Sequence, residues 1–196
     1  TNSNEIADWL DCKLVKNDWR PVPLSEGVCD GGQVTMSDGE TFEVKPSLRG
    51  IPIDLGVQSV QQGGQSLVFA ETRVRSKSLA TKAADVVSQL LQKKELTALE
   101  KTSKQILAEN EHTEIVKTLA TLIKKGVAFH HAGLNQKCRE IVEKEFRKGT
   151  IKLLSSTPTL AAGVNLPARR VVISNINRYN AKVGANRPIS VLEYKQ

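Results

Sequence analysis

The sequence has few cysteines and no long apolar run. Its three cysteines, Cys12, Cys29 and Cys138, are far apart and include no Cys-x-x-Cys pair, which argues against a zinc ribbon or a disulfide framework. This cysteine usage favours a reducing, intracellular setting. No span of about 18 apolar residues occurs, so the sequence predicts no transmembrane helix. The first ten residues lack the basic start and apolar centre of a secretory signal.

Two signatures of a complete nucleotide-hydrolysing site are also missing. Gly27 and Gly32 have the spacing of a phosphate-binding loop, but Gln33 follows where that loop requires lysine. No Asp-Glu dipeptide occurs in the chain. Phosphoryl transfer needs such a loop, metal-holding acids and an arginine finger. We therefore expect no catalytic residue in this chain and no turnover by the chain alone.

What the sequence does contain is ordinary for one globular α/β core. The 196 residues are 39% hydrophobic and 25% charged, values typical of a folded domain. Lys and Arg number 28 against 21 Asp and Glu, so the formal charge is +7. A positive charge of this size favours a polyanionic partner, although solvated lysine faces give the same count.

The chain is organised around residues 151–172. An apolar run at 151–154 predicts a buried strand, and the hydroxyl side chains that follow it predict a turn. Thr157 is a good N-cap, Pro158 suits the first helical position, and Gly163 would end the short helix. Free N–H groups at a helix start favour a phosphate, and short hydroxyls nearby can contact phosphates without reading bases. These hydroxyls belong to Ser155, Ser156, Thr157 and Thr159. An ordinary capped turn remains the alternative.

Two further strands end in polar residues. A strand at 67–70 precedes Arg73 and Arg75, which could hold phosphates or be exposed charges, and a helix follows to residue 91. Residues 126–134 predict a strand that runs into a tight turn containing two adjacent histidines. Successive strand residues face opposite sides, so we expect no metal site there.

The remaining segments complete a parallel sheet flanked by helices, with right-handed connections. We expect a helix in the first ten residues with Ile6, Trp9 and Leu10 on its buried face. Glycine-bearing turns predict a β-hairpin at 30–44, and Pro and Gly predict an irregular segment at 45–62. Two amphipathic helices are expected at 93–125, one helix at 136–148, and a long hairpin after residue 174.

The string TPTLAAGVNLPARRVV at 157–172 resembles motif V of superfamily two helicases. Its form is that of the Ski-type branch, closest to archaeal and HelQ-like DNA repair helicases. Phe69, Thr72 and Arg73 resemble motif IV, and FHHAGL at 129–134 resembles the motif between IV and V. The resemblance covers nearly the whole chain and implies a second RecA-like motor domain, α/β in class, with an N-terminal β-hairpin extension and a helical insertion.

The domain organisation that the resemblance implies spans residues 1–196. Residues 1–62 form the edge-strand and hairpin region, 63–175 the strand-helix units with the insertion at 93–125, and 174–196 a terminal β-hairpin. Motif VI would begin at Gln196, so we expect an excised part of a longer protein.

The resemblance also implies the site residues. Six would contact nucleic acid: Thr72, Arg73, His131, Gly133, Thr157 and Thr159. Two would couple the strand to the nucleotide: Gly163 and Asn165, the latter often Asp in the superfamily but commonly Asn in the Ski-type branch. Four would lie near the tip of a strand-separating hairpin: Arg178, Tyr179, Asn180 and Lys182.

The implied activity is ATP-dependent unwinding of single-stranded or branched DNA in the 3′ to 5′ direction during repair or replication-fork processing. ATP and Mg²⁺ would be bound by the intact enzyme and not by this chain alone. The partners would be the first RecA-like domain and the C-terminal domains of the same polypeptide, inside an archaeal cell or a eukaryotic nucleus. Three alternatives are a Ski-type RNA helicase domain, a non-catalytic nucleic-acid-binding module, and an α/β domain with neither activity.

Overall fold

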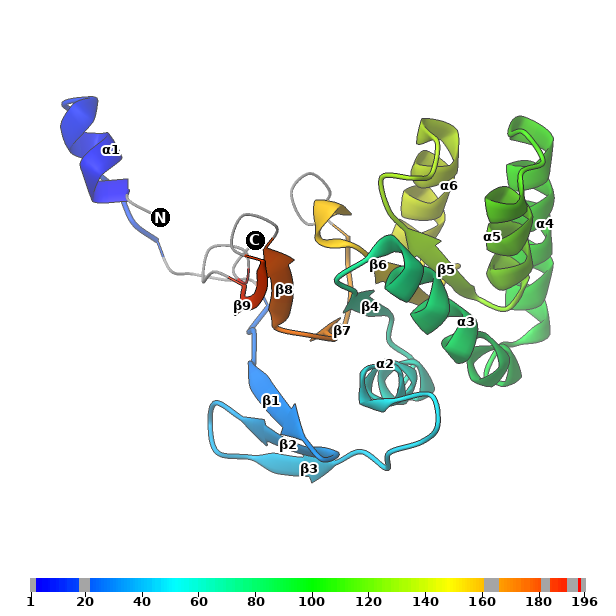
Figure 1. Cartoon of the computed structure of the whole chain (residues 1–196), viewed down its shortest axis with the longest axis horizontal. Coiled ribbons are helices and arrows are strands. Elements are labelled where there is room, and N and C mark those ends of the chain that lie inside the picture. The colour runs from blue at the N-terminus through cyan, green and yellow to red at the C-terminus, as the bar shows by residue number, and fades with distance from the viewer. Residues whose placement is uncertain (1–2, 18–21, 161–165, 181–183, 190–193, 195–196) are drawn as a thin grey trace.

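A parallel sheet forms the centre of the protein, as predicted. The computed structural model describes residues 3–17, 22–160, 166–180, 184–189 and 194. Within them, β4 (Ser66–Phe69), β5 (Val127–His130), β6 (Leu153–Ser156) and β7 (Arg170–Ile173) form a four-stranded sheet in the order β5-β6-β4-β7. All of its pairings are parallel. The expected RecA-like α/β class is confirmed by this sheet and the helices that pack on it (Figure 1).

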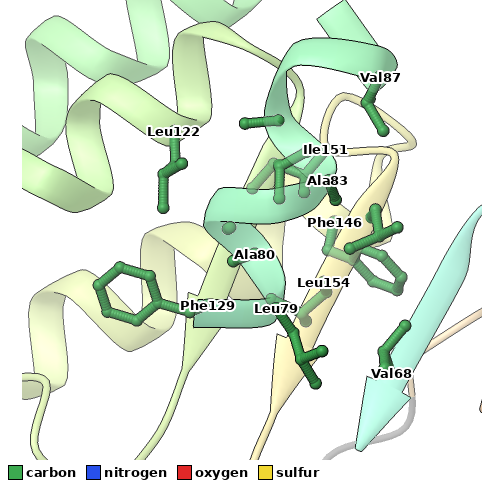
Figure 2. Packing of buried hydrophobic residues seen from close by; sticks show 14 of the residues in the cluster. Val68, Leu79, Ala80, Ala83, Val87, Leu122, Phe129, Phe146, Ile151 and Leu154 are labelled. Atoms are coloured by element: carbon green, nitrogen blue, oxygen red, sulfur yellow. The ribbon is translucent and has the colours of Figure 1, made fainter. Parts of the chain in front are cut away.

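Helix α3 (Arg73–Gln89) supplies much of the packing on the sheet. Its apolar residues Leu79, Ala83 and Val87 recur every four positions, so they share one face of the helix, and each is fully buried. This face lies against β5 and β6, and Figure 2 shows Leu154 and Phe146 beside it. Burial of each large apolar side chain contributes about 1.5–3 kcal/mol. The hydrophobic face therefore fixes α3, and with it the loop that precedes the helix.

The predicted helical insertion is an antiparallel pair, α4 (Lys93–Glu109) and α5 (Glu114–Lys124). The two helices pack on each other, and α5 also lies against β5. Leu99, Ile106, Leu119 and Ile123 are fully buried, but Leu96 retains 41% of its accessible surface. The Ser103 hydroxyl donates to the Ala120 carbonyl over 2.9 Å. Helix α6 (Gln136–Arg147) covers β5 and contacts α4.

The prediction of an irregular segment at 45–62 was wrong, because this segment contains α2 (Ile51–Gln61). Pro52 lies in the first turn, where a missing N–H costs nothing. Gly56 lies at the point where α2 meets the sheet: a Cβ there would be 3.0 Å from Leu153 Cδ1 and 3.4 Å from Val68 Cγ2. The Pro and Gly that suggested helix breakers therefore serve as a helix start and as a close packing contact.

The N-terminal region differs from the prediction in burial. Helix α1 (Ser3–Trp9) forms, but its expected buried face is exposed: Trp9 retains 83% of its accessible surface, and Ile6 and Leu10 retain half or more. Figure 1 shows α1 away from the rest of the protein, so those side chains have no core to enter.

The predicted hairpin at 30–44 is present as part of a three-stranded antiparallel sheet. Its strands are β1 (Gly27–Asp30), β2 (Gln33–Met36) and β3 (Thr41–Glu43). Arg170 joins this sheet to the core. Its guanidinium lies 5.4 Å from the Phe42 ring centre and donates to the Leu55 carbonyl over 3.0 Å.

Strands β8 (Asn177–Asn180) and β9 (Ala185–Pro188) form a hairpin after β7, in the segment where one was predicted. Tyr179 pairs with Asn186 and Asn180 with Ala185, next to the connecting residues. The hairpin is closed at its base because the Ile189 N–H donates to the Ile176 carbonyl over 2.7 Å. Among the described residues, no helix is long and apolar enough to cross a membrane.

Candidate nucleic-acid interface

Three strands of the sheet end at the same level. The register places Ser156, at the end of β6, beside both His130 of β5 and Phe69 of β4. Because all of these strands are parallel, their carboxyl ends meet at one edge, where open α/β sheets bind their ligands. The segments that carry six predicted contact residues therefore leave the sheet from adjacent points.

After β6, the chain makes a tight turn with two paired threonines. The Thr157 N–H donates to the His130 carbonyl over 3.1 Å, and the Thr157 and Thr159 hydroxyls are 2.9 Å apart. Thr159 is exposed, whereas Thr157 retains only 8% of its accessible surface. The predicted helix at this point is a 3-10 turn, η1 (Pro158–Leu160), in the described residues. Thr159 is thus the hydroxyl in this turn that is best placed to meet a ligand.

The prediction that Ser155 and Ser156 offer hydroxyls to a ligand was wrong. Both residues have no accessible surface. The Ser156 hydroxyl donates within the protein, with the carbonyls of His130 and Thr157 at 3.0 and 2.9 Å. These serines belong to the last residues of a strand that is buried on both faces, as central parallel strands are.

After β4, Thr72 and Arg73 begin α3 and both are exposed. The Thr72 hydroxyl is the N-cap and accepts the Arg75 N–H over 3.1 Å. A hydroxyl that accepts this bond still has a proton to donate. Thr72 and Arg73 can therefore offer an O–H and a guanidinium to the same ligand. The half-buried Glu71 beside them accepts the Ser174 hydroxyl over 3.3 Å, which ties this segment to the end of β7.

After β5, His131 and Gly133 form a compact loop against Arg73. The Gly133 N–H donates to His131 Nδ1 over 3.1 Å, so the neutral ring carries its proton on Nε2. The imidazole stacks on Phe129 with 5.4 Å between the ring centres, and His131 is only 3% exposed. Burial, and then the positive charge of Arg73, lower the pKa of His131. The ring is therefore neutral and held within the protein.

The neighbouring His130 has a different environment. Its Nε2–H donates to the Glu143 carboxylate over 2.9 Å, and its buried Nδ1 has no hydrogen-bond partner in the part of the chain that the structure describes. Burial lowers the pKa of His130, although the bond to Glu143 opposes this effect. Among the residues that the structure describes, no group of three or more His, Cys, Asp or Glu side chains could hold a metal ion.

The structure describes only some of the remaining predicted residues. Gly163, Asn165 and Lys182 are outside the described residues. Arg178, Tyr179 and Asn180 lie in β8.

Two polar residues that support the site were not predicted from the sequence. One is Glu71, which lies next to the motif IV residues but belongs to no motif that we recognised. The other is Ser76, whose hydroxyl donates to the Ser155 carbonyl over 2.9 Å. Hydrophobic periodicity predicts which face of α3 packs on the sheet, but it does not predict side-chain hydrogen bonds of this kind.

The comparisons with known proteins agree with this geometry. A family model for the helicase conserved C-terminal domain matches residues 84–183. ATP-dependent DNA helicase Hel308 from Methanocella arvoryzae is 43% identical over 195 residues, which cover 100% of this chain and 26% of that protein.

The proteins of the same name from Pyrobaculum calidifontis and Caldivirga maquilingensis are each 42% identical, again over 100% of this chain. The chain covers 27% and 26% of their lengths. It therefore spans about a quarter of the length of the curated relatives it matches.

Proposed function

The chain belongs to the family of helicase conserved C-terminal domains, and we propose that it is the second RecA-like motor domain of an ATP-dependent DNA helicase. Its task in that enzyme is to hold one strand of DNA by the phosphate backbone. The names of the similar proteins, all DNA helicases, support DNA over RNA as the substrate.

The observation that carries this proposal is the meeting of three strand ends at one sheet edge. Thr72, Arg73 and Thr159 are exposed there, on segments that leave adjacent strands. Hydroxyls and a guanidinium suit phosphate oxygens, and contacts to phosphates are independent of base sequence. A motor that moves along DNA needs such contacts, because every nucleotide must be held in the same way.

The other predicted residues have roles in the same proposal. Gly163 and Asn165 follow the threonine turn in the chain and would couple strand binding to the nucleotide. The hairpin of β8 and β9 would separate the duplex, with Arg178, Tyr179, Asn180 and Lys182 near its tip. Its position supports this role, because it follows β7 directly and β7 pairs with the strand that leads to Arg73.

Cofactors and partners follow from the activity. ATP and Mg²⁺ would bind between this domain and a first RecA-like domain. The contacts between the two domains would differ with and without bound ATP, and this difference would move the DNA strand. The expected polarity is 3′ to 5′ on branched DNA, in repair or fork processing. A protein with this substrate works inside the cell.

The proposal is tested by ATP hydrolysis and strand separation with the complete gene product on a forked DNA. We expect hydrolysis that single-stranded DNA stimulates, and separation that requires ATP. Replacement of Thr159 by Val removes its hydroxyl at nearly constant size and is expected to raise the DNA concentration needed for half-maximal stimulation. Lys82→Ala, on the exposed face of α3, is the control. DNA-independent hydrolysis in both proteins would contradict the proposal.

A further inference from the structure

The loop after β5 holds a histidine that faces the protein more than the solvent. His131 retains 3% of its accessible surface, and its ring stacks on Phe129 at an interplanar angle of 17°. Its Nδ1 accepts the N–H of the residue two positions later. A side chain that accepts from the backbone two residues on stabilises a tight turn in the way that Asn and Asp do. The ring is therefore part of the loop's architecture.

The same loop borders Arg73. A methyl group at Gly133 would lie 3.0 Å from His131 Nδ1 and 3.4 Å from Arg73 Nη1. The imidazole and the guanidinium thus both lie close to one backbone position, where a side chain would be crowded. Arg73 itself is exposed, and no hydrogen bond or ion pair of its side chain occurs with the described residues. An arginine side chain loses rotamer freedom when it binds a phosphate. A loop that packs beside the guanidinium restricts its rotamers beforehand and so reduces the entropy cost of binding.

We propose that His131 is a positioning residue, which shapes the loop at Gly133 so that this loop holds the Arg73 guanidinium toward the DNA phosphate. His131 does not itself contact the strand. This inference rests on the function proposed above. It assigns the loop of 131–134 a supporting role, whereas Arg73, Thr72 and Thr159 make the contacts.

Substitutions at His131 separate the two roles. His131→Asn keeps an acceptor for the Gly133 N–H but has no imidazole, and His131→Phe keeps the aromatic stack but has no acceptor. A positioning role predicts that H131N retains affinity for single-stranded DNA within about threefold, whereas H131F loses about as much as Arg73→Ala, roughly tenfold. A direct contact predicts that H131N and H131F lose affinity equally.

A variant outside the buried ring guards against a folding defect in H131F. Gly133 is exposed and has no positive φ, so Gly133→Ala is compatible with the backbone. Its methyl group would crowd His131 and Arg73, so one or both must shift, and we expect a loss of affinity similar to that of R73A although no charge changes. Thermal unfolding of each variant establishes that it is folded.

The readout is DNA affinity of the complete gene product, measured by fluorescence anisotropy at several salt concentrations. H131F and G133A are expected to reduce the salt dependence as R73A does, and R73A/H131F to bind no more weakly than R73A, because residues that act together are not additive. Equal losses in H131N and H131F, or full affinity in H131F, would overturn the positioning role while the proposed function stands. Full affinity in R73A would instead overturn the phosphate site itself.

Discussion

The Ser76 hydroxyl donates to the Ser155 carbonyl over 2.9 Å, and both residues are fully buried. This bond joins the first turn of α3 to the end of β6. Arg73 lies three residues before Ser76, and Thr159 lies four residues after Ser155. Both Arg73 and Thr159 are exposed. Besides the pairing of β4 with β6, a buried side-chain hydrogen bond therefore links the two segments that carry the proposed phosphate contacts.

Replacement of Ser76 by Ala is expected to lower the free energy of unfolding by about 1–2 kcal/mol, because the buried carbonyl loses a partner. Urea denaturation measures the change. Ser88→Ala is the matched control on the same helix, since the Ser88 hydroxyl donates to the carbonyl of the exposed Asp85, within that helix. A loss in S76A no larger than in S88A would show that the bond does not hold α3 to β6.

Replacement of Gly56 by Ala sets two effects against each other. Ala is favoured over Gly in a helix by about 1 kcal/mol. Its Cβ would lie 3.0 Å from Leu153 Cδ1, and overpacking of a core typically costs about 1–3 kcal/mol. Leu153 and Val68 are fully buried, and close packing of the core resists their movement, so we expect net destabilisation.

The second variant for this contact is Leu153→Val, which removes the methyl group that Gly56→Ala would meet. The double variant is expected to be more stable than the sum of the single changes predicts, as measured by urea denaturation. Simple additivity would mean that the two residues do not compete for the same space.

Acid is expected to destabilise the fold through its two buried histidines. Burial lowers the pKa of both His130 and His131 below the value near 6.5 that an unfolded chain has. The unfolded chain therefore binds more protons below about pH 6.5, and stability falls as the pH falls toward the lowered folded-state values. Urea midpoints from pH 7.5 to 5 measure this, with the exposed His112→Gln as the control. A midpoint that rises over this interval would contradict it.

Periodicity and turn chemistry predicted most of the elements. The apolar rows of α3 and α6 and the short runs of β4, β5 and β6 depend on burial, which leaves a clear pattern. The same rules failed at α2, where Gly56 is required by a tertiary contact that the local sequence does not show. They also failed at Trp9, because an amphipathic stripe predicts a buried face but not what covers it.

The site could be predicted only in outline. Motif resemblance located Thr72, Arg73, His131 and Thr159 and implied that they contact nucleic acid. Which of the polar residues near the strand ends face solvent depends on packing. Ser155, Ser156 and His131 are buried because they lie at or just after the ends of fully buried strands. Sequence alone could not separate these residues from their exposed neighbours.

The central claim is that Arg73 and Thr159 hold the phosphates of a DNA strand. It is tested by the affinity of the complete gene product for single-stranded DNA between about 50 and 200 mM salt. We expect affinity to fall steeply with salt. The slope of log affinity against log salt concentration is expected to decrease by about 0.7 in Arg73→Ala, which loses one phosphate contact. The slope is expected to stay unchanged in Thr159→Val, which binds more weakly but loses no charge. A flat salt response, or an unchanged slope in R73A, would contradict the account.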